Sequence, residues 1–276
     1  MIKHSLKRIA NLFGYEIKQI AGPPAWPKPD TTPQQDEVIK GPWQGQVLQM
    51  ANRTYQPKEL YYHRTRFGDD HRLKYMTHFL DLRDLRVLEM GPLEGHHSVI
   101  IEKMGARENI AIESRDDNLA KCQRIKQKYG LDRTTFLRGD IEKLSDGRER
   151  PQFSGRFDII FCVGVLYHLP EPAKALAWFA SQADVLFLGT HYTEPNEKAD
   201  ATYDHNGKTY RGKTFREDGI ENPISGMSPT SLWPYEGDLI KMIKDAGYSR
   251  VSVLGRDLLN NTPHITVLAD MGRKRV

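Results

Sequence analysis

Short apolar segments alternate with amphipathic segments through the middle of the chain. The apolar segments begin at Arg86, Asn109, Thr134, Phe157 and Asp184, and each has the length of a buried strand. Strands that alternate with helices predict a parallel, doubly wound α/β sheet. The intervening helices are expected over residues 97–104, 116–129 and 173–181, and an acidic loop is expected after Asp140.

An insertion and two more strands complete the pattern after residue 192. Asn206-Gly207 lies between two tyrosine-bearing arms of the insertion, which is a strong signal for a β-hairpin. A hairpin that leaves the ligand edge of the sheet is well placed to cover a site there. A loop and a helix that ends at Gly247 follow. We expect a lid-like insertion over 193–235, the helix over 235–246 and the final strands over 250–258 and 264–270.

The beginning of the chain differs from the rest. Apolar residues recur every three or four positions within residues 1–20, with lysines between them, which predicts an amphipathic helix. We favour packing of this helix on its own domain or on a second subunit, and a peripheral helix at the inner membrane face is the alternative. Residues 21–42 form a proline-rich, extended linker. The main domain is then 43–276, in which 43–83 is an N-terminal cap.

Composition and charge limit the cellular compartments and the classes of binding partner that we expect for this protein. No apolar run is long enough to span a membrane, and residues 1–20 lack the apolar core of a signal peptide. Cys122 and Cys162 are expected to be buried, reduced thiols, which indicates a cytoplasmic protein. Basic residues are in excess only in residues 1–20 and 273–275, so the body of the chain between them, residues 21–272, has no basic surplus. This distribution argues against a nucleic acid substrate.

The segment Arg86–Ser98 carries the strongest functional signal. It reads as a strand, a glycine-bearing turn and the start of a helix. Gly91 and Gly95 let the backbone approach a ligand closely, and the helix aims its first N–H groups at that ligand. The acidic Glu89 argues against a phosphate and favours a ligand with positive charge. S-adenosylmethionine fits, because it carries an ammonium and a sulfonium group.

Polar residues follow at the ends of the next strands. Glu113 ends the second strand roughly 20 residues after the glycine turn, where a Rossmann-type sheet places the carboxylate that binds ribose hydroxyls. Asp140 ends the third strand, and a turn at Gly164 follows the fourth. Because the carboxyl ends of parallel strands meet at one edge of the sheet, these residues predict a single ligand site.

These motifs resemble those of class I S-adenosylmethionine-dependent methyltransferases over about residues 85–192. The resemblance implies a Rossmann-like, doubly wound, seven-stranded sheet that is mostly parallel, with an antiparallel last strand. It also implies S-adenosylmethionine as the cofactor, with Glu113 at its ribose and Asp140 with Ile141 beside its adenine. The expected cofactor-binding residues are Glu89, Gly91, Pro92, Leu93, Gly95, Glu113, Ser114, Asp140, Ile141, Val163 and Gly164.

Parts of the chain resemble different branches of these enzymes. Residues 162–172, CVGVLYHLPEP, are similar to wobble-uridine tRNA oxyacetyl-forming transferases and to many small-molecule methyltransferases. Residues 88–98 and 189–193 are more similar to a bacterial group linked to surface-glycan or secondary metabolism. Leu93 departs from the family pattern, since it stands where many members have the middle glycine. The turn must therefore tolerate a side chain there, and Pro92 would stiffen it.

Methyl transfer to oxygen requires two aligned partners and removal of the acceptor's proton. His191, at the end of the fifth strand, is the first candidate for general base or substrate anchor, and a hydrogen bond to its own loop is the alternative role. Tyr167 is a candidate for contact with the cofactor or acceptor, or for core packing, and His168 for capping its loop. No metal is expected, because neither His-Glu-x-x-His nor paired-cysteine spacing occurs.

The sequence therefore predicts an enzyme that transfers a methyl group to oxygen of a small-molecule or glycan-like acceptor. Two alternatives stay open: a tRNA wobble-uridine carboxymethyl or methyl transferase, and a non-catalytic, membrane-associated scaffold of the same fold. A homo-oligomer also stays open. Tyr61, His63 and Arg66 in the cap are candidates for cofactor or substrate contact, and the alternative is a cap that packs on the sheet with its polar tips at the surface. Asp200, Asp204 and His205 are interpreted as a solvated cluster.

Overall fold

The computed structural model describes residues 75–76, 79–259 and 262–272. The predicted helix over 1–20, the linker over 21–42 and most of the 43–83 cap lie outside the described residues, as do Tyr61, His63, Arg66 and the basic tail. Within the described part of the chain, no helix has the length and apolar character needed to cross a membrane.

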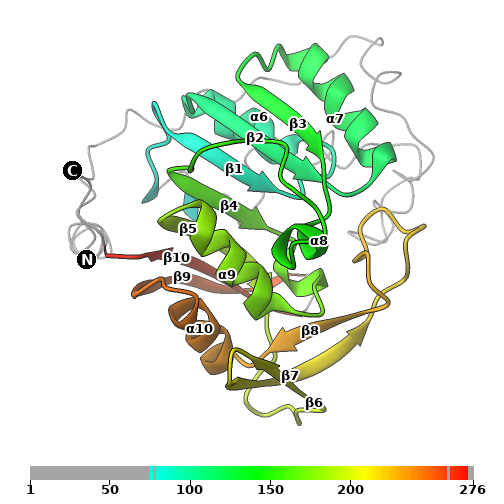
Figure 1. Ribbon diagram of the computed structural model, residues 1–276, viewed down its shortest axis with the longest axis vertical. Helices are drawn as coiled ribbons and strands as arrows, with labels where there is room; N and C mark the ends of the chain where they lie inside the picture. Colours follow the sequence, from blue (N-terminus) through cyan, green and yellow to red (C-terminus); the bar gives the residue numbers. More distant parts are fainter. Residues whose placement is uncertain (1–74, 77–78, 260–261, 273–276) are drawn as a thin grey trace.

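Seven strands form one sheet in the order β3-β2-β1-β4-β5-β10-β9 (Figure 1). The strands β1 to β5 pair in parallel, and β10 runs antiparallel to both β5 and β9. The predicted Rossmann-like sheet, mostly parallel with an antiparallel last strand, is confirmed. The strands are β1 (Arg86–Met90), β2 (Glu108–Glu113), β3 (Thr134–Arg138), β4 (Ile159–Val163), β5 (Val185–His191), β9 (Arg250–Leu259) and β10 (Thr262–Asp270).

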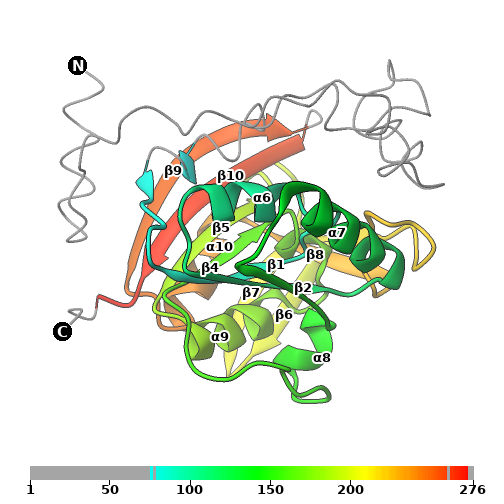
Figure 2. The ribbon, with the colours of Figure 1, turned by 90° about the horizontal axis from the view of Figure 1, so that it is seen from above.

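Helices cover both faces of the sheet, as Figure 2 shows from above. The helices α6 and α7 lie on one face, and α8, α9 and α10 lie on the other. The acidic loop expected after Asp140 is instead the short helix α8, because the Asp140 side chain caps it by accepting the Glu142 N–H at 3.0 Å. The other four helices match the predicted ranges within one residue at each end. The helices are α6 (His96–Lys103), α7 (Asp116–Tyr129), α8 (Ile141–Ser145), α9 (Pro172–Gln182) and α10 (Glu236–Asp245), with a 3₁₀ turn η1 (Leu166–His168).

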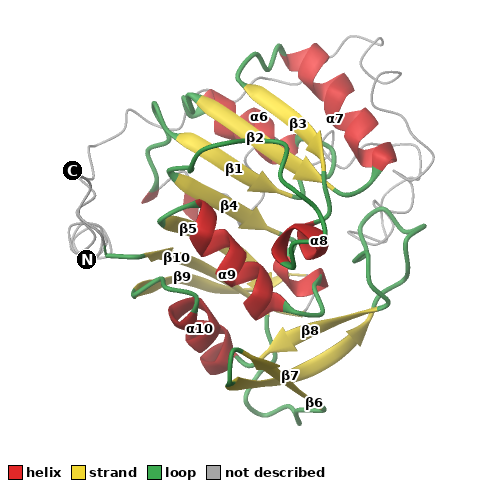
Figure 3. Ribbon diagram, viewed as in Figure 1, coloured by secondary structure: helices red, strands yellow, loops and turns green. Residues whose placement is uncertain are grey.

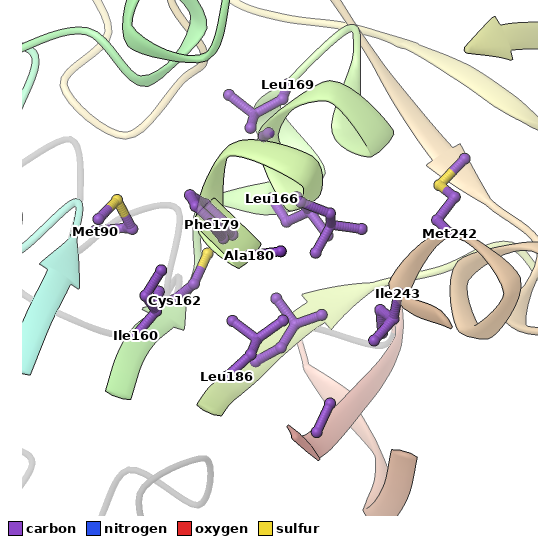
Figure 4. Close-up of a cluster of buried hydrophobic side chains, with 14 of the residues drawn as sticks. Met90, Ile160, Cys162, Leu166, Leu169, Phe179, Ala180, Leu186, Met242 and Ile243 are labelled. Carbon is purple, nitrogen blue, oxygen red and sulfur yellow. The ribbon is translucent and has the colours of Figure 1, made fainter. Parts of the chain in front are cut away.

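Alternation along the strands divides the core into two layers. Successive residues of a strand point to opposite faces, so Leu88 packs in the layer that contains α9, whereas Val87 packs in the layer that contains α6 and α7. Figure 4 shows the first of these layers, where Cys162 lies among apolar side chains. Cys122 belongs to the second layer, and both thiols are fully buried, as predicted. Burial raises the pKa of both thiols, that of Cys162 to about 12.

The insertion forms a second sheet of three antiparallel strands (Figure 3). The predicted hairpin is confirmed, because Asn206 and Gly207 form the turn that joins its two strands. Both turn residues are left-handed, with φ angles of 50° and 72°. The loop expected after residue 230 is instead a strand, because it pairs along the second arm of the hairpin. At Gly212 the pairing is so close that a Cβ would lie 2.3 Å from the Trp233 carbonyl oxygen. The strands are β6 (Ala201–His205), β7 (Lys208–Arg216) and β8 (Thr230–Pro234).

Candidate active site

A cavity of about 420 Å³ opens at the carboxyl ends of the parallel strands, beneath the loop that joins β7 to β8. Its volume lies in the range of small-molecule sites. Its position matches the ligand edge that the strand order predicts. Most residues expected in the site line it, namely Gly91, Pro92, Leu93, Glu113, Ser114, Asp140, Ile141, Val163, Gly164, Tyr167, His168 and His191.

In the turn after β1, every second residue has a left-handed backbone. Gly91, Leu93 and Gly95 have φ angles of 61°, 56° and 86°. Leu93 thus adopts the conformation of the glycine that it replaces, at a cost of about 1–2 kcal/mol. Gly91 has a second constraint, because a Cβ there would lie 2.5 Å from Cγ2 of Val165. The turn therefore brings bare backbone to the cavity at Gly91.

Glu113 ends β2 and is 4% exposed. Its carboxylate accepts the backbone N–H of Arg115 at 3.0 Å and the N–H of Leu93 at 3.2 Å, so it ties the turn to the end of β2. Burial raises the pKa of Glu113, and these hydrogen bonds together with one from Asn118 oppose the rise. A carboxylate held this way at the cavity wall can accept hydrogen bonds from the hydroxyls of a ribose, so the residues present fit a nucleoside-containing cofactor.

Glu89 and Gly95 lie behind the wall rather than on it. Glu89 is fully buried, and its Oε2 accepts Ser98 Oγ–H at 2.6 Å and Asn109 Nδ2–H at 2.8 Å. These bonds join β1 to α6 and β2, and burial raises the pKa of the Glu89 carboxyl. Gly95 packs against Ile125 and Phe136. Both residues support the turn from below.

Tyr167 and His168 of η1 meet His191, the last residue of β5, at one side of the cavity. The ring centroids of Tyr167 and His191 are 4.5 Å apart, and those of Tyr167 and His168 are 4.3 Å apart. His191 is 6% exposed, and its Nδ1 lies 2.9 Å from the Pro263 carbonyl oxygen. Because a carbonyl only accepts hydrogen bonds, Nδ1 carries the proton and Nε2 is the basic nitrogen of neutral His191. His191 therefore combines both of its predicted roles: Nδ1 makes a hydrogen bond to the loop, and Nε2 is a basic nitrogen.

Glu217, at the end of β7, was not expected in the site. Its Oε2 lies 3.0 Å from Nδ1 of His168 and accepts the Ser225 hydroxyl at 2.8 Å and the Gly226 N–H at 2.6 Å. Burial alone would raise the pKa of Glu217, but His168 and the Gly226 N–H lower it to about 2. The pairing joins residues 49 positions apart, so no local sequence signal indicates it.

Arg115 and Asn118 also tie the β7–β8 loop to the main sheet, and neither was expected in the site. The Arg115 guanidinium donates to the carbonyls of Ile220 and Gly226 at 3.3 and 3.2 Å. The Asn118 amide donates to the Pro223 carbonyl at 3.1 Å. The loop, drawn between β7 and β8 in Figure 1, is therefore held over the cavity by side chains that also surround Glu113.

The aspartates of the acidic cluster in the insertion make hydrogen bonds within the inserted sheet. Asp200 accepts the Thr214 N–H at 2.7 Å, and Asp204 accepts the Thr209 hydroxyl at 2.5 Å, so both side chains stabilise the hairpin. No group of three histidine, cysteine or acidic side chains that could hold a metal ion occurs in the part of the chain that the structure describes.

Comparison with known proteins shows which family and which relatives this chain is similar to. Residues 81–194 match a family described as a methyltransferase domain. The chain is 26% identical over 124 residues to a tRNA U34 carboxymethyltransferase of Campylobacter hominis, a match that covers 44% of this chain and 41% of that protein. It is 27% identical over 109 residues to the same enzyme of Actinobacillus pleuropneumoniae, covering 40% and 32%. The chain therefore spans less than half the length of these relatives.

Solved structures share the fold. The N-terminal domain of EvdMO1 with SAH bound has a TM-score of 0.57 and 26% identity, over 67% of this chain and 74% of that one. The magnesium protoporphyrin IX methyltransferase ChlM of Synechocystis, also with SAH bound, has a TM-score of 0.50 and 16% identity, over 85% and 98%. The prediction of a Rossmann-like class I methyltransferase fold is confirmed, and the EvdMO1 domain that shares it was solved with SAH bound.

Proposed function

We propose that this class I S-adenosylmethionine-dependent methyltransferase transfers a methyl group to a hydroxyl of a small-molecule or glycan-like acceptor. The observation that carries the proposal is His191, held in the cavity wall with its Nδ1 proton on the Pro263 carbonyl. That hydrogen bond leaves Nε2 as the nitrogen that accepts a proton. A hydroxyl acceptor needs such a group, because it loses its proton as it is methylated.

The cofactor half of the reaction rests on residues at the ends of β1, β2 and β3. S-adenosylmethionine, when bound, supplies a methyl group on a sulfonium that is already reactive. Glu113 would hold the ribose, and Ile141 with Asp140 would frame the adenine. A Cβ at position 91 would clash with Val165, so this position requires glycine. The bare backbone of Gly91 would let the cofactor approach closely.

On the acceptor side, His191 would accept the hydroxyl proton at Nε2 while the acceptor oxygen forms its bond to the methyl carbon and displaces S-adenosylhomocysteine, with cleavage of the sulfur–methyl bond. Tyr167 and Trp233 border His191 and give this side of the cavity an aromatic surface. The loop between β7 and β8 contributes residues 222–227 to the wall and restricts the entry of water. Exclusion of water and alignment of two partners are the main contributions that the protein makes to such a transfer.

The size of the cavity favours a small acceptor. Its volume suits a small molecule, whereas nucleic acids are usually bound on an extended basic surface. Residues 21–272 have no basic surplus in their sequence. Both observations support a small or glycan-like acceptor over tRNA.

The test combines activity with cofactor binding. We would incubate the protein with S-adenosylmethionine and a panel of sugars, nucleotide sugars and bulk tRNA, and follow methylated products by mass spectrometry. His191→Asn keeps a donor for the Pro263 carbonyl but removes Nε2, so turnover should fall about 10²-fold or more with unchanged affinity for S-adenosylhomocysteine. Full turnover in this variant would contradict the role of His191.

A matched pair of variants tests the cofactor half by calorimetry. Glu113→Gln should weaken S-adenosylhomocysteine binding about 10-fold or more, because a charged acceptor contributes about 1.5–3 kcal/mol. Glu102→Gln is the control, since Glu102 is also buried and hydrogen-bonded, to Thr134 and Arg133, but lies away from the cavity. Equal affinity in both variants would contradict the cofactor site.

A second candidate function is carboxymethyl transfer to the wobble uridine of tRNA. The two curated relatives support it, since both are tRNA U34 carboxymethyltransferases. It predicts tRNA binding that weakens steeply with salt and a carboxymethyl product from a carboxylated cofactor. Modification of tRNA without modification of any small hydroxyl compound would favour this candidate over the first.

A further inference from the structure

We propose that Trp233 is a positioning residue that fixes the ring of His191, so that the inserted sheet completes the acceptor side of the site. The inference rests on the proposed function of His191 as the proton acceptor. Trp233 lies on β8, and His191 lies at the end of β5. The two residues meet because β8 and β5 both pack beside η1 at the cavity.

The contact between the two rings is a close parallel stack. The centroids of Trp233 and His191 are 4.7 Å apart, and the ring planes differ by 9°. The Trp233 indole N–H also donates to the Tyr167 carbonyl at 2.8 Å, and Tyr167 presents its ring edge-on to His191. Trp233 therefore contacts His191 directly and also holds the residue that contacts it next.

Stacking and hydrogen bonding restrain the same rotation of the histidine ring. Rotation about the Cβ–Cγ bond would swing Nε2 and would also carry Nδ1 away from the Pro263 carbonyl. The flat indole parallel to the ring opposes that rotation from the ring face, so it adds to a restraint that one hydrogen bond supplies at the ring edge. The basic nitrogen keeps one direction only while both contacts exist, and proton transfer depends on that direction.

Trp233 is itself held firmly by the inserted sheet. Its ring stacks on Phe215 of β7 with centroids 3.7 Å apart, and its carbonyl accepts the Thr193 hydroxyl at 2.7 Å. The preceding residue of the strand, Leu232, donates its N–H to the Leu169 carbonyl at 3.0 Å, which docks β8 on the segment after η1. The inserted sheet is thus a support for His191 as well as a cover for the cavity.

The cofactor side is separate from this support. Gly91 and Glu113 make their described contacts with Val165, Leu93, Arg115 and Asn118, and none of those contacts involves Trp233. Loss of Trp233 should therefore alter the His191 ring and turnover but leave cofactor binding intact. A residue that served only general stability would affect both together.

The experiment compares Trp233→Phe with Trp233→Leu in the full-length protein. Phenylalanine keeps a flat ring and loses the indole N–H, whereas leucine loses both. We would record ¹⁵N–¹H spectra of the histidine rings, assigned with His191→Asn, and measure S-adenosylhomocysteine affinity by calorimetry. Wild type and the phenylalanine variant should show His191 protonated at Nδ1 only. The leucine variant should lose that single state, with affinity within about twofold of wild type.

Turnover provides a second readout once an acceptor is known. The leucine variant should lose about 10²-fold in kcat and the phenylalanine variant should recover most of it, because a misplacement of about 1 Å at the reacting groups costs about this much. An unchanged His191 spectrum in Trp233→Leu, or loss of cofactor binding in step with it, would overturn the inference.

Two further outcomes separate this inference from the proposed function. Should Trp233→Leu fail to fold, Phe215→Leu keeps Trp233 and removes its stacking partner, and it should loosen the His191 ring partway; an unaltered ring there overturns the inference. If the ring state depends on Trp233 but no hydroxyl acceptor is ever methylated, the positioning role stands and the proposed function fails.

Discussion

The turn after β1 shows how single residues set the limits of the cofactor site. Three alternate positions need a left-handed backbone, and glycine fills two of them without strain. Leu93 fills the third, and its backbone is held by the N–H bond to Glu113 and by the Cys122 thiol, which donates to its carbonyl at 3.2 Å. Local contacts thereby compensate for a residue that the turn alone would disfavour.

Gly91 and Gly130 permit a matched test of this turn. Both have φ of 61°, but a Cβ on Gly130 would meet nothing within 4 Å, whereas one on Gly91 would clash with Val165. Gly130→Ala should cost about 1–2 kcal/mol from backbone strain alone. Gly91→Ala should cost about 1–3 kcal/mol more from overpacking and should also weaken S-adenosylhomocysteine binding. Urea unfolding and calorimetry of both variants provide the check, and equal losses would contradict the close approach at Gly91.

At the scale of elements, the loop between β7 and β8 is the part of the insertion that completes the cavity. Arg115 and Asn118 hold it from the main sheet, and Glu217 holds it to His168. Each of these contacts joins segments far apart in sequence. The insertion is therefore docked by specific polar bonds at the cavity and by the packing of β8 beside η1.

The Glu217 contact should make the docking of this loop depend on pH. Because the pKa of Glu217 is lowered to about 2, its contribution to stability is complete above the ordinary value of 4.5 and is lost as the pH falls toward 2. Glu217→Gln should therefore cost about 1.5–3 kcal/mol at pH 7, and the gap from wild type should shrink below pH 4.5. Chemical unfolding across this pH range measures the gap.

Glu171→Gln is the control for that measurement. Glu171 pairs with Lys174 at 2.6 Å on the surface, where ion pairs contribute little, so the substitution should change stability by less than about 1 kcal/mol. A Glu217→Gln deficit that stays constant down to pH 3 would contradict the lowered pKa.

For the whole molecule, cofactor binding should stabilise the main sheet and the inserted sheet together, because the cavity wall contains residues of both. At about 100 times its Kd, S-adenosylhomocysteine should raise the free energy of unfolding by about 2.7 kcal/mol. The rise in Tm should appear in full in wild type and in Glu102→Gln, and it should be about half as large or less in Glu113→Gln at the same concentration, because the ligand is then at about 10 times the Kd of that variant or below. A rise of equal size in all three proteins would place the ligand elsewhere.

The strand and helix pattern was predictable because its signals are local. Buried parallel strands give short apolar runs, and Asn206-Gly207 gives the hairpin, since few residues adopt its backbone angles. The prediction was wrong at α8 and β8. The Asp140 side chain caps the first turn of α8, a role that was not predicted for it. β8 is a strand because it pairs with β7. The residues that dock the loop were missed because their partners are remote in sequence.

The sequence by itself determined the alternation of strands and helices and the residues at the carboxyl ends of the strands, because those features follow from periodicity and from the rule that parallel strands share one ligand edge. The seven-stranded sheet with an antiparallel last strand followed from the family resemblance. Tertiary structure decided which of those residues face the cavity. It placed Glu89 behind the turn, brought Glu217 to His168 and set Trp233 against His191. Such contacts depend on how the inserted sheet docks on the main sheet, and packing between distant segments has no local pattern that a sequence displays.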